Sequence, residues 1–335
     1  MTWDEIDWPA LDRLREGFLR GVAPGGAYWK SASDLASYDF TYGERIGWKW
    51  DHVLRELKLR GWRPASRHVF DWGCGSGVAG RRVIAAFGAE HFDALTLWDH
   101  SAVACDFAAD AASRTFPSLR AASATPGFLG SAEPIGLLVI SHVLNELSAE
   151  HLASLRALVK RAQEVLWVEP GTHPVSRQLG TIRDGLRDTF SLVAPCTHQL
   201  GCPMFAPGNE RHWCHFFAPP PAEIFADSNW VKFGQRAGID LRSLPYCFVA
   251  LDRRPPPAMT DLSRIIGRTE HFKPYARWLN CDATGLLELE LPKRADPALF
   301  KQLERTKAPL VYRWTRQGDK VSSGEPFSAN PPETS

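Results

Sequence analysis

Short apolar runs alternate with amphipathic stretches between residues 67 and 169 of this 335-residue chain. The apolar runs read HVFDW, ALTLWD, IGLLVIS and EVLWVEP. Runs of about four to eight such residues, separated by segments with helical periodicity, are typical of successive βαβ units whose strands are buried on both faces. The pattern therefore predicts an α/β fold with a doubly wound, Rossmann-like parallel sheet.

The chain is longer than one average domain, so we expect structure on both sides of this core. Leucine spacing in VLRELKLRGW indicates a helical cap before the sheet, and LPYCFVALDR indicates a late antiparallel strand. PPPAM, at 255–259, is typical of a linker, and ARWLNCDATGLLELELPK and APLVYRW after it alternate like strands. The predicted division is a helical region at 1–62, a main domain at 63–252 with a Cys-rich insertion at 194–221, a small β-rich module at 253–317 and a disordered, polar tail at 318–335.

Composition narrows the class of protein. No apolar run reaches the roughly 18 residues of a membrane span, and the first residues, MTWDEIDWPALDRL, contain no apolar signal core. We therefore expect a cytoplasmic protein with no membrane partner. We also expect a monomer. The net charge of +1 produces no global field for polyanions, so any contact with nucleic acid must come from a local patch.

A glycine-rich bend, VFDWGCGSG, follows the first strand of the predicted sheet. Gly73, Gly75 and Gly77 suit a tight turn with positive φ, in which the backbone lies against a ligand. A dinucleotide-binding fingerprint, G-x-G-x-x-G, also fits the chain at Gly75, Gly77 and Gly80. The bend thus predicts a nucleotide-type cofactor and leaves two candidates, NAD and S-adenosylmethionine.

Two carboxylates favour S-adenosylmethionine. Asp71, just before the bend, can orient the amino-acid end of that cofactor through its ammonium group, directly or through water. Asp99, at the end of ALTLWD, suits an acceptor for the two ribose hydroxyls. An acid followed by x-Gly-x-Gly-x-Gly resembles the first motif of the class I methyltransferase superfamily, and this resemblance covers residues 67–169.

The residues after IGLLVIS are expected at the reactive end of the cofactor, because ligands of open α/β sheets bind beyond the carboxyl ends of the strands. They include Ser141, His142, Asn145 and Glu146. His142 is a candidate base, and Glu146 can orient a nucleophile; the alternative is that both cap or pack the following helix. The Asn/Asp-Pro-Pro-Tyr/Phe pattern of amine-methylating enzymes is absent from the sequence.

Cysteines gather in the insertion. Cys196, Cys202 and Cys214 lie within 19 residues of a loop rich in Pro, Gly and His, which favours metal ligands over core thiols. The seven cysteines of the chain are an odd number, and no secretory signal accompanies them, which argues against a disulfide framework. Cys281, at an expected turn, is a better fourth ligand than Cys247, which lies inside an apolar run. Zinc and an iron–sulfur cluster both suit thiolate ligands.

Four motifs together resemble a known family. SHVLNEL, WVEPGT, APC-x5-CP and WCHF are similar to motifs of the methyltransferase-like proteins associated with the mitochondrial small ribosomal subunit and their bacterial relatives, the family of methyltransferase-like protein seventeen. The likeness runs from about Phe40 to Lys293, although Thr197-His198 stands where the family typically has Pro-His after the first cysteine.

This resemblance implies a factor that contacts small-subunit ribosomal RNA during assembly or translation initiation. It also implies a [4Fe–4S] cluster on four cysteines, which in this sequence are Cys196, Cys202, Cys214 and Cys281. Two functions follow: a methyltransferase acting on ribosomal RNA, or a non-catalytic assembly factor with a structural iron–sulfur or zinc site. A third function, a radical enzyme that uses a cluster and S-adenosylmethionine together, is disfavoured because the Cys-x3-Cys-x2-Cys motif of such enzymes is missing.

The residues expected to contact RNA are cationic: Arg253, Arg254, Arg264, Arg268, Lys273 and Arg277.

Overall fold

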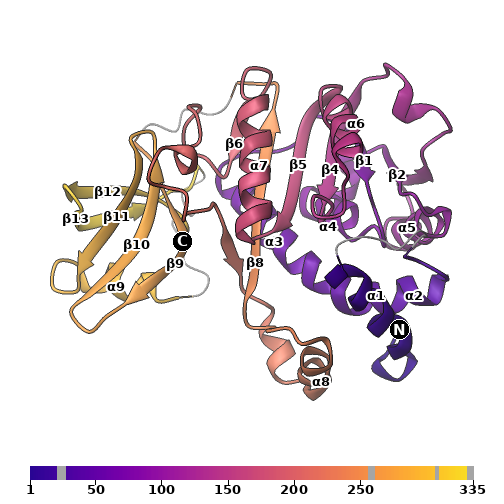
Figure 1. Ribbon diagram of the computed structural model, residues 1–335, viewed down its shortest axis with the longest axis horizontal. Coiled ribbons are helices and arrows are strands. Elements are labelled where there is room, and N and C mark those ends of the chain that lie inside the picture. The colour runs from indigo at the N-terminus through magenta and orange to yellow at the C-terminus, as the bar shows by residue number, and fades with distance from the viewer. Residues whose placement is uncertain (21–27, 256–260, 306–308, 330–335) are drawn as a thin grey trace. The chain divides into compact units, whose positions relative to one another are not determined.

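The computed structural model describes every residue except 21–27, 256–260, 306–308 and 330–335. The four last residues of the predicted linker, 256–259, and the end of the predicted tail therefore lie outside the described residues. In chain order the helices and strands are α1 (Trp8–Arg20), α2 (Ala32–Tyr38), α3 (Glu44–Leu59), β1 (His68–Trp72), α4 (Val78–Phe87), β2 (Ala94–Trp98), α5 (Ala102–Thr115), β3 (Arg120–Ser123), β4 (Ile135–Ser141), α6 (Ala149–Val159), β5 (Ala162–Pro170), α7 (His173–Leu186), β6 (Ser191–Ala194), β7 (Phe216–Ala218), α8 (Ser228–Ala237), β8 (Leu244–Asp252), β9 (Ser263–His271), β10 (Tyr275–Asp282), β11 (Gly285–Pro292), α9 (Pro297–Leu303), β12 (Val311–Gln317) and β13 (Lys320–Pro326) (Figure 1).

The chain forms two compact units, each assembled from separate stretches of sequence. Unit 1 comprises Met1–Leu54, Pro64–Glu169 and Pro220–Leu244, whereas unit 2 comprises Arg55–Arg63, Pro170–Pro219 and Pro245–Ser335. The domains predicted from sequence are consecutive segments and therefore differ from these two units. Sequence patterns identify helices and strands more readily than the partners against which they pack.

Unit 1 contains five parallel strands in the order β3-β2-β1-β4-β5. The order turns back at β1, which pairs with β2 on one side and with β4 on the other. The central residues of β4 are fully buried, as expected for a strand covered on both faces. The structure thus confirms the predicted doubly wound, Rossmann-like α/β sheet.

Local sequence explains where the helices of unit 1 begin. The Ser101 hydroxyl accepts a hydrogen bond from the backbone N–H of Ala104, and the Ser148 hydroxyl accepts one from His151, so each serine caps the helix that follows it. The buried face of α5 carries small residues, including Ala104 and Ala108. These small side chains allow the backbone at Gly77 to approach α5 closely.

Unit 2 has an antiparallel pair formed by β6 and β8, and β7 also pairs with β8. This finding confirms the antiparallel strand predicted from LPYCFVALDR. Among the described residues, no helix is long and apolar enough to cross a membrane.

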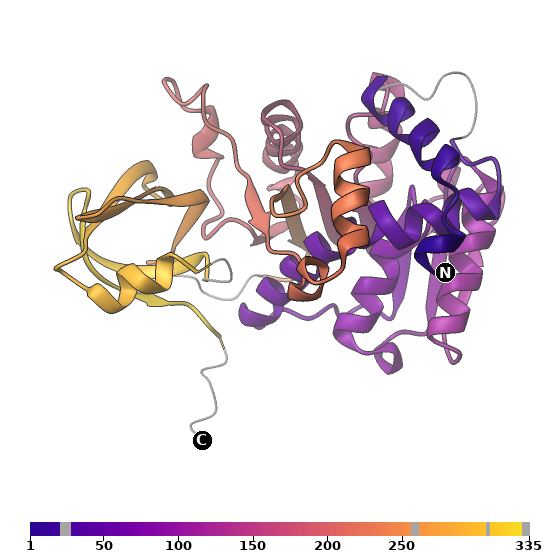
Figure 2. The same cartoon turned by 90° about the horizontal axis from the view of Figure 1, so that it is seen from below.

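The rest of unit 2 is a closed barrel with the strand order β10-β11-β13-β12-β9, closed by pairing between β9 and β10. Helix α9 lies beside these strands (Figure 2). The side chains of β10 alternate between buried and partly exposed, and Trp278 and Tyr312 contribute to an apolar core that α9 closes with Phe300. This alternation is the period of a strand with one face in the core.

The predicted disordered tail is wrong for residues 320–326, which form β13. This strand pairs with β12 in antiparallel orientation and buries Val321 in the barrel. Its other residues are mostly polar and exposed, so composition alone indicated disorder. A strand at the surface of a barrel requires few apolar residues when its neighbours supply the core.

Candidate functional sites

A cavity of about 540 Å³ lies in unit 1, where β1, β2 and β4 end. Its volume is within the usual range of small-molecule sites. Aromatic rings, the glycine bend and several polar groups form its wall. The lining residues are Phe18, Tyr28, Trp29, Tyr38, Ile46, Trp72, Gly73, Cys74, Gly75, Ser76, Val78, Ala79, Trp98, Asp99, His100, Ser101, Ser141, His142, Val143, Glu146, Leu147, Ser148 and His151.

The three predicted glycines form the bend between β1 and α4. Gly73, Gly75 and Gly77 have φ values of +68°, +52° and +76°, which residues with a Cβ rarely adopt. Gly73 and Gly75 line the cavity. Gly77 packs against α5 instead, because a Cβ there would lie 2.7 Å from the Cβ of Ala108. The bend therefore combines backbone exposed to the cavity with a close helix contact behind it.

Asp71 lies behind the bend and does not line the cavity. Its Oδ2 accepts a hydrogen bond of 2.9 Å from the backbone N–H of Gly80, and its Oδ1 has no hydrogen-bond partner among the described residues. Burial raises the pKa of Asp71 to about 7. A Cβ on Gly80 would lie 2.8 Å from Oδ2, so only a glycine at this position leaves room for the Asp71 carboxyl group. This contact explains the third glycine of the dinucleotide fingerprint without a phosphate.

Asp99 lies at the cavity wall as predicted. Its Oδ2 accepts from the backbone N–H of Gly75 at 3.0 Å, and its Oδ1 accepts from Ser101 at 2.9 Å. Burial raises the pKa of Asp99. Each carboxylate oxygen can accept a second hydrogen bond, so Asp99 can hold a vicinal diol. The buried Ser76 hydroxyl on the same wall has no partner among the described residues, and it offers a further polar contact to a ligand.

Ser141 and His142 also line the cavity, and His142 adopts a left-handed backbone conformation with φ of +57°. The His142 Nε2 lies 3.0 Å from the Lys49 Nζ, and its Nδ1 lies 3.2 Å from the Ser141 Oγ. The Trp50 indole donates to the same Oγ at 3.0 Å. Because an ammonium group only donates, Nε2 accepts and the ring proton is on Nδ1. Burial and the charge of Lys49 lower the pKa of His142 well below its usual value, so His142 is a weak base at neutral pH.

Glu146 lines the cavity, whereas Asn145 is exposed and does not line it. Desolvation by the surrounding protein and the charge of Asp99 raise the pKa of Glu146 to about 7, although the residue keeps exposed surface. Burial and the neighbouring Glu146 carboxylate raise the pKa of Tyr28 to about 12. A carboxyl group with a pKa near neutrality can take up or release a proton at physiological pH, so Glu146 suits a base better than His142 does.

Two parts of this site were not predicted from the sequence. The first is Glu169, whose Oε1 accepts from the backbone N–H groups of Val143 and Leu144 and from the Trp167 indole, at 3.1, 3.2 and 2.7 Å. This buried carboxyl group positions the segment after β4. An acid at the end of a predicted strand, in WVEP, is the only sequence signal for it.

The second missed part is the aromatic wall supplied by the N-terminal residues. Phe18, Tyr28, Trp29 and Tyr38 all line the cavity. Their rings contact one another, with centroids 4.9 Å apart for Trp29 and Tyr38. No motif marks these residues, because an aromatic residue in a helical region is equally typical of a core.

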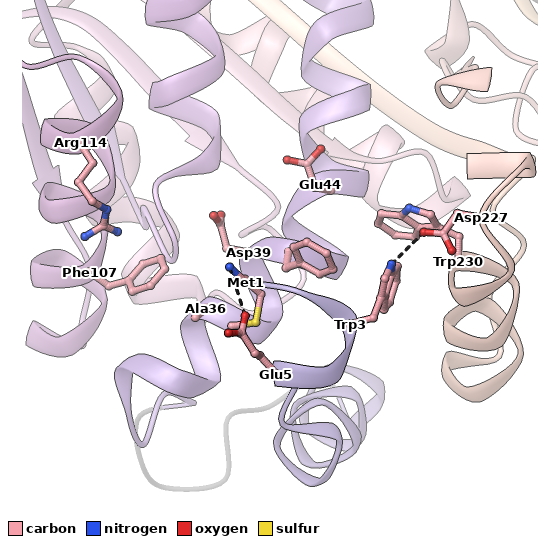
Figure 3. A pocket seen from close by; sticks show the side chains of 11 residues that line it. Met1, Trp3, Glu5, Ala36, Asp39, Glu44, Phe107, Arg114, Asp227 and Trp230 are labelled. Carbon is pink, nitrogen blue, oxygen red and sulfur yellow. Dashed lines mark hydrogen bonds and ion pairs between the residues drawn. The ribbon is translucent and has the colours of Figure 1, made fainter. Parts of the chain in front are cut away.

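A second cavity of about 780 Å³ lies in unit 1 beside the first residues of the chain (Figure 3). The Trp3 indole donates to the Asp227 carboxylate at 2.9 Å, next to Trp230. Asp39 and Glu44 form ion pairs with arginines of α4. This cavity is larger, but these acidic groups already have partners and none of the predicted site residues line it. The smaller cavity therefore carries the candidate chemistry.

The four predicted cysteine ligands all lie in unit 2, near enough for their thiols to affect one another's pKa. Burial raises the pKa of Cys202 to about 11 and raises those of Cys214 and Cys281 further. In each case the neighbouring thiols add to the effect, and Cys196 contributes to all three. Cys247 is separate, with its Sγ 3.5 Å from the Pro170 carbonyl oxygen. Within the described part of the chain, no group of three or more His, Cys, Asp or Glu side chains is arranged to hold a metal ion.

Buried donors and cations surround these thiols. Burial lowers the pKa of Arg183, but the neighbouring Cys196 and Cys202 and the ion pair with Asp184 raise it overall; its Nε and Nη2 have no hydrogen-bond partner among the described residues. The Thr197 hydroxyl and the His198 Nε2 are likewise buried without a described partner. Because a metal–thiolate centre is anionic, unpaired donors and a buried cation beside four thiols fit such a centre.

Arg264 is a correction to the predicted RNA contacts. Its side chain is fully buried in unit 2, forms an ion pair with Glu56 and lies 3.8 Å from the centre of the Phe216 ring. Sequence alone could not separate this buried arginine from a surface one. Arg268 and Lys273 are exposed, although the Arg268 guanidinium lies 4.0 Å from the centre of the Phe217 ring.

The chain is similar to several solved structures. Among solved structures, the chain is similar to the plantazolicin methyltransferase BamL in complex with a desmethyl analogue and SAH, with 10% identity, coverage of 73% of this chain and 100% of that one, and a TM-score of 0.41. It is similar to magnesium protoporphyrin IX methyltransferase from Synechocystis PCC 6803 with bound SAH, with 12% identity, coverage of 74% and 96%, and a TM-score of 0.39. It is also similar to the ribosomal protein L11 methylase of Lactobacillus delbrueckii subsp. bulgaricus, with 17% identity, coverage of 42% and 69%, and a TM-score of 0.31.

These TM-scores are low, so the strand order and the family match, rather than the neighbours, identify the fold. No curated protein matches the chain. The family model described as mitochondrial small ribosomal subunit Rsm22 matches residues 51–292, which is well over half of the chain and includes the glycine bend and all four clustered cysteines. The chain therefore belongs to the Rsm22 family, and its α/β unit has the class I methyltransferase-like fold.

Proposed function

We propose that this chain is an S-adenosylmethionine-dependent methyltransferase-like protein that acts on or with the small ribosomal subunit. The observation that carries the cofactor assignment is the Asp99 carboxylate, which is bonded to the backbone of the glycine bend at the wall of a 540 Å³ cavity. The family supports the ribosomal assignment, because its description names the mitochondrial small ribosomal subunit.

The residues present fit the cofactor. Asp99 would accept from the ribose hydroxyls, and the backbone of Gly73 and Gly75, which lines the cavity, would lie against the ligand. The Ser76 hydroxyl, which has no described partner, would offer a further hydrogen bond. When bound, S-adenosylmethionine supplies a methyl group already activated by its sulfonium. The chain therefore contributes mainly alignment, which is a large part of the rate in such transfers.

On the acceptor side we propose Glu146 as the proton acceptor, because its pKa lies near 7. His142 has a positioning role: Lys49 and Ser141 hold its ring neutral and in one orientation. Asp71 acts from behind the bend, through its bond to Gly80, and contacts the ligand only through water.

We further propose that Cys196, Cys202, Cys214 and Cys281 hold a [4Fe–4S] cluster, as the family resemblance implies. The pKa values of the Cys202, Cys214 and Cys281 thiols, which burial and the neighbouring thiols raise, support this assignment. So do the unpaired donors of Arg183, Thr197 and His198. Zinc would use the same thiolates. In either case the positive metal centre would take the place of four thiol protons. Its attraction for the four thiolates would offset the energetic penalty of burying them.

Calorimetric titration tests the cofactor. We expect wild-type protein to bind S-adenosylmethionine and its demethylated product S-adenosylhomocysteine (SAH). Binding of NADH should be at least 100-fold weaker than binding of either. Tighter binding of NADH would overturn the assignment and restore the dinucleotide alternative.

Anaerobic purification tests the metal. Broad visible absorption and about four irons per chain would support the cluster. One zinc and no colour would replace it with a structural zinc site. A preparation that takes up neither metal on reconstitution would refute both.

A second candidate, a non-catalytic assembly factor, is favoured by the lowered pKa of His142, which leaves the acceptor side without an active histidine. It predicts that Asp71→Ala with Asp99→Ala leaves small-subunit maturation intact in cells lacking the wild-type gene. A loss of maturation in this variant, with the protein still folded, would contradict the second candidate and support the enzyme.

A further inference from the structure

The barrel of unit 2 has a specific topology. Numbered along the chain, its strands follow the order 2-3-5-4-1, strand 1 pairs with strand 2, and the only helix among its described residues, α9, lies between strands 3 and 4. Strands 3 and 5, which are β11 and β13, pair in parallel. This is the arrangement of the OB-fold, in which strands 2 and 3 and the adjoining loops bind oligonucleotides or oligosaccharides. A fold alone does not assign a function, so the equivalent face must be judged by its own residues.

That face is formed here by β10 and β11. Tyr275 and Arg277 are the partly exposed residues at the first end of β10, and they lie opposite Pro292 and Glu290 of β11. Cys281 lies at the other end of the same strand, among the clustered cysteines. Only the first end, beside the loop 272–274, is therefore available to another ligand.

An aromatic platform lies at this end. Phe272 is 40% exposed, and its ring stacks on Tyr275 with centroids 4.7 Å apart and an angle of 27°. The Phe272 N–H donates to the Tyr275 carbonyl oxygen at 2.9 Å, which fixes the turn that presents both rings. The Arg277 guanidinium lies 5.4 Å from the centre of the Phe272 ring, so a nucleic-acid base can stack on this exposed pair where Arg277 leaves it open.

Cations surround the platform. Lys273, Lys293 and Arg294 are exposed, and among the described residues none of the three forms an ion pair. The Lys293 N–H donates to the Pro274 carbonyl oxygen at 2.8 Å, which brings the end of β11 next to the 272–274 loop. Lys320 and Arg277 are close enough to Tyr275 for an electrostatic interaction.

The acidic groups of this face are already paired. Glu270 and Glu288 lie within 2.7 and 3.5 Å of Arg277, and Glu290 lies 2.9 Å from Lys320. The unpaired charge at this end is therefore positive, which complements a phosphate backbone.

We propose that the face formed by Phe272, Lys273, Tyr275, Lys293 and Arg294 binds single-stranded RNA. Bases stack on the two rings, and the three cations contact phosphates. A single strand is required because a duplex does not offer the faces of its bases for stacking. The proposal rests on the proposed function, since it names the surface that meets the ribosomal subunit.

Fluorescence anisotropy with a short labelled oligouridine tests the proposal on the full chain. Phe272→Leu with Tyr275→Leu keeps apolar bulk but removes the rings, and we expect binding to weaken about tenfold or more. Lys273→Ala with Lys293→Ala and Arg294→Ala should reduce the slope of log affinity against log salt by about 2, because each lost phosphate contact contributes about 0.7. Lys301→Ala, an exposed cation on α9, is the matched control and should change neither quantity.

Unchanged affinity in the Leu variant, or equally tight binding of an RNA duplex, would overturn the proposal, provided that thermal denaturation shows both variants folded. Sedimentation with small ribosomal subunits and titration with SAH separate this failure from that of the proposed function. If wild-type protein binds SAH and subunits while the Leu variant keeps full RNA affinity, only the RNA surface is refuted. If wild-type protein binds neither SAH nor subunits, the proposed function fails whatever the oligouridine shows.

Discussion

The cavity of unit 1 and the cysteine cluster of unit 2 differ in how far the protein's own hydrogen bonds hold their groups. Gly75 and Ser101 donate to Asp99, so the main polar group of the cavity wall is positioned by the protein itself, although the Ser76 hydroxyl beside it has no described partner. The cysteine cluster has raised thiol pKa values and buried donors that lack described partners. In the proposed function, the first site takes a ligand that binds and dissociates, whereas the second holds a permanent metal centre.

The largest expected effect tests the second half of this comparison. Cys214→Ala should remove the metal and weaken unit 2 by several kcal/mol, because the binding energy of a structural metal is also folding energy. Metal content and protection of residues 196–214 from proteolysis measure the change.

Cys105→Ala, in unit 1, is the matched control and should retain the metal. If Cys214→Ala kept the full metal content and protection, the cluster would not be a metal site. The contrast with the cavity would then disappear.

The next largest effect concerns the preformed cavity. Gly77→Ala places a Cβ 2.7 Å from Ala108 at a φ of +76°, and we expect a loss of about 2–4 kcal/mol in the free energy of unfolding, together with loss of SAH binding. Urea denaturation of both proteins measures it. Gly127→Ala is the matched control, since Gly127 has a φ of +87° but nothing within 4 Å of an added Cβ. Equal losses in the two variants would assign the effect to backbone strain alone.

A smaller effect is expected from Asp99→Asn. This change removes the charge and one of the two backbone hydrogen bonds of Asp99, so SAH binding should weaken about 10- to 50-fold. Calorimetry of the variant measures the loss. Asp93→Asn, just before β2, should leave the affinity unchanged because Asp93 is exposed and paired with Arg67. An unaltered affinity in Asp99→Asn would exclude this carboxylate from the site.

The smallest effect separates the two ligands by pH. Glu146, with a pKa of about 7, is largely neutral at pH 6 and ionised at pH 8. An anion favours the sulfonium cation, so the affinity for S-adenosylmethionine relative to neutral-sulfur SAH should rise about 3- to 10-fold between these pH values. Glu146→Gln should abolish the rise. A ratio that does not change with pH in wild-type protein would place Glu146 away from the methyl group.

Sequence predicted the parts of the fold and the sites that depend on residue type. Gly73, Gly75 and Gly77 were recognisable because only glycine adopts such φ values easily, and the strands β1, β2, β4 and β5 because parallel strands form continuous apolar runs. Cys281 was grouped with the other three cysteines because a four-coordinate site needs a fourth ligand; in the structure Cys196 and Cys202 affect its pKa, and its role as a metal ligand stays a prediction.

Sequence failed where a side chain's role depends on a distant partner. Arg264 reads as a surface cation until Glu56 is seen beside it, and Glu169 reads as the end of a strand until it accepts from the turn after β4. The aromatic wall at Tyr28 and Trp29 comes from residues far upstream of the bend that they cover. Such contacts have no local period or motif, so the chain must fold before they can be read.

The closure of the barrel has a consequence for its partners. β9 pairs with both β10 and β12, so each strand of the barrel has a neighbour on both sides, although β9 and β12 share only two paired positions. A partner that binds by adding a strand, as many peptides and misfolded chains do, would have to enter beside strands that are already paired over part of their length. Side chains and turns offer the simpler surface for recognition at this module, and they can change in evolution without disturbing the hydrogen bonds that hold the barrel together.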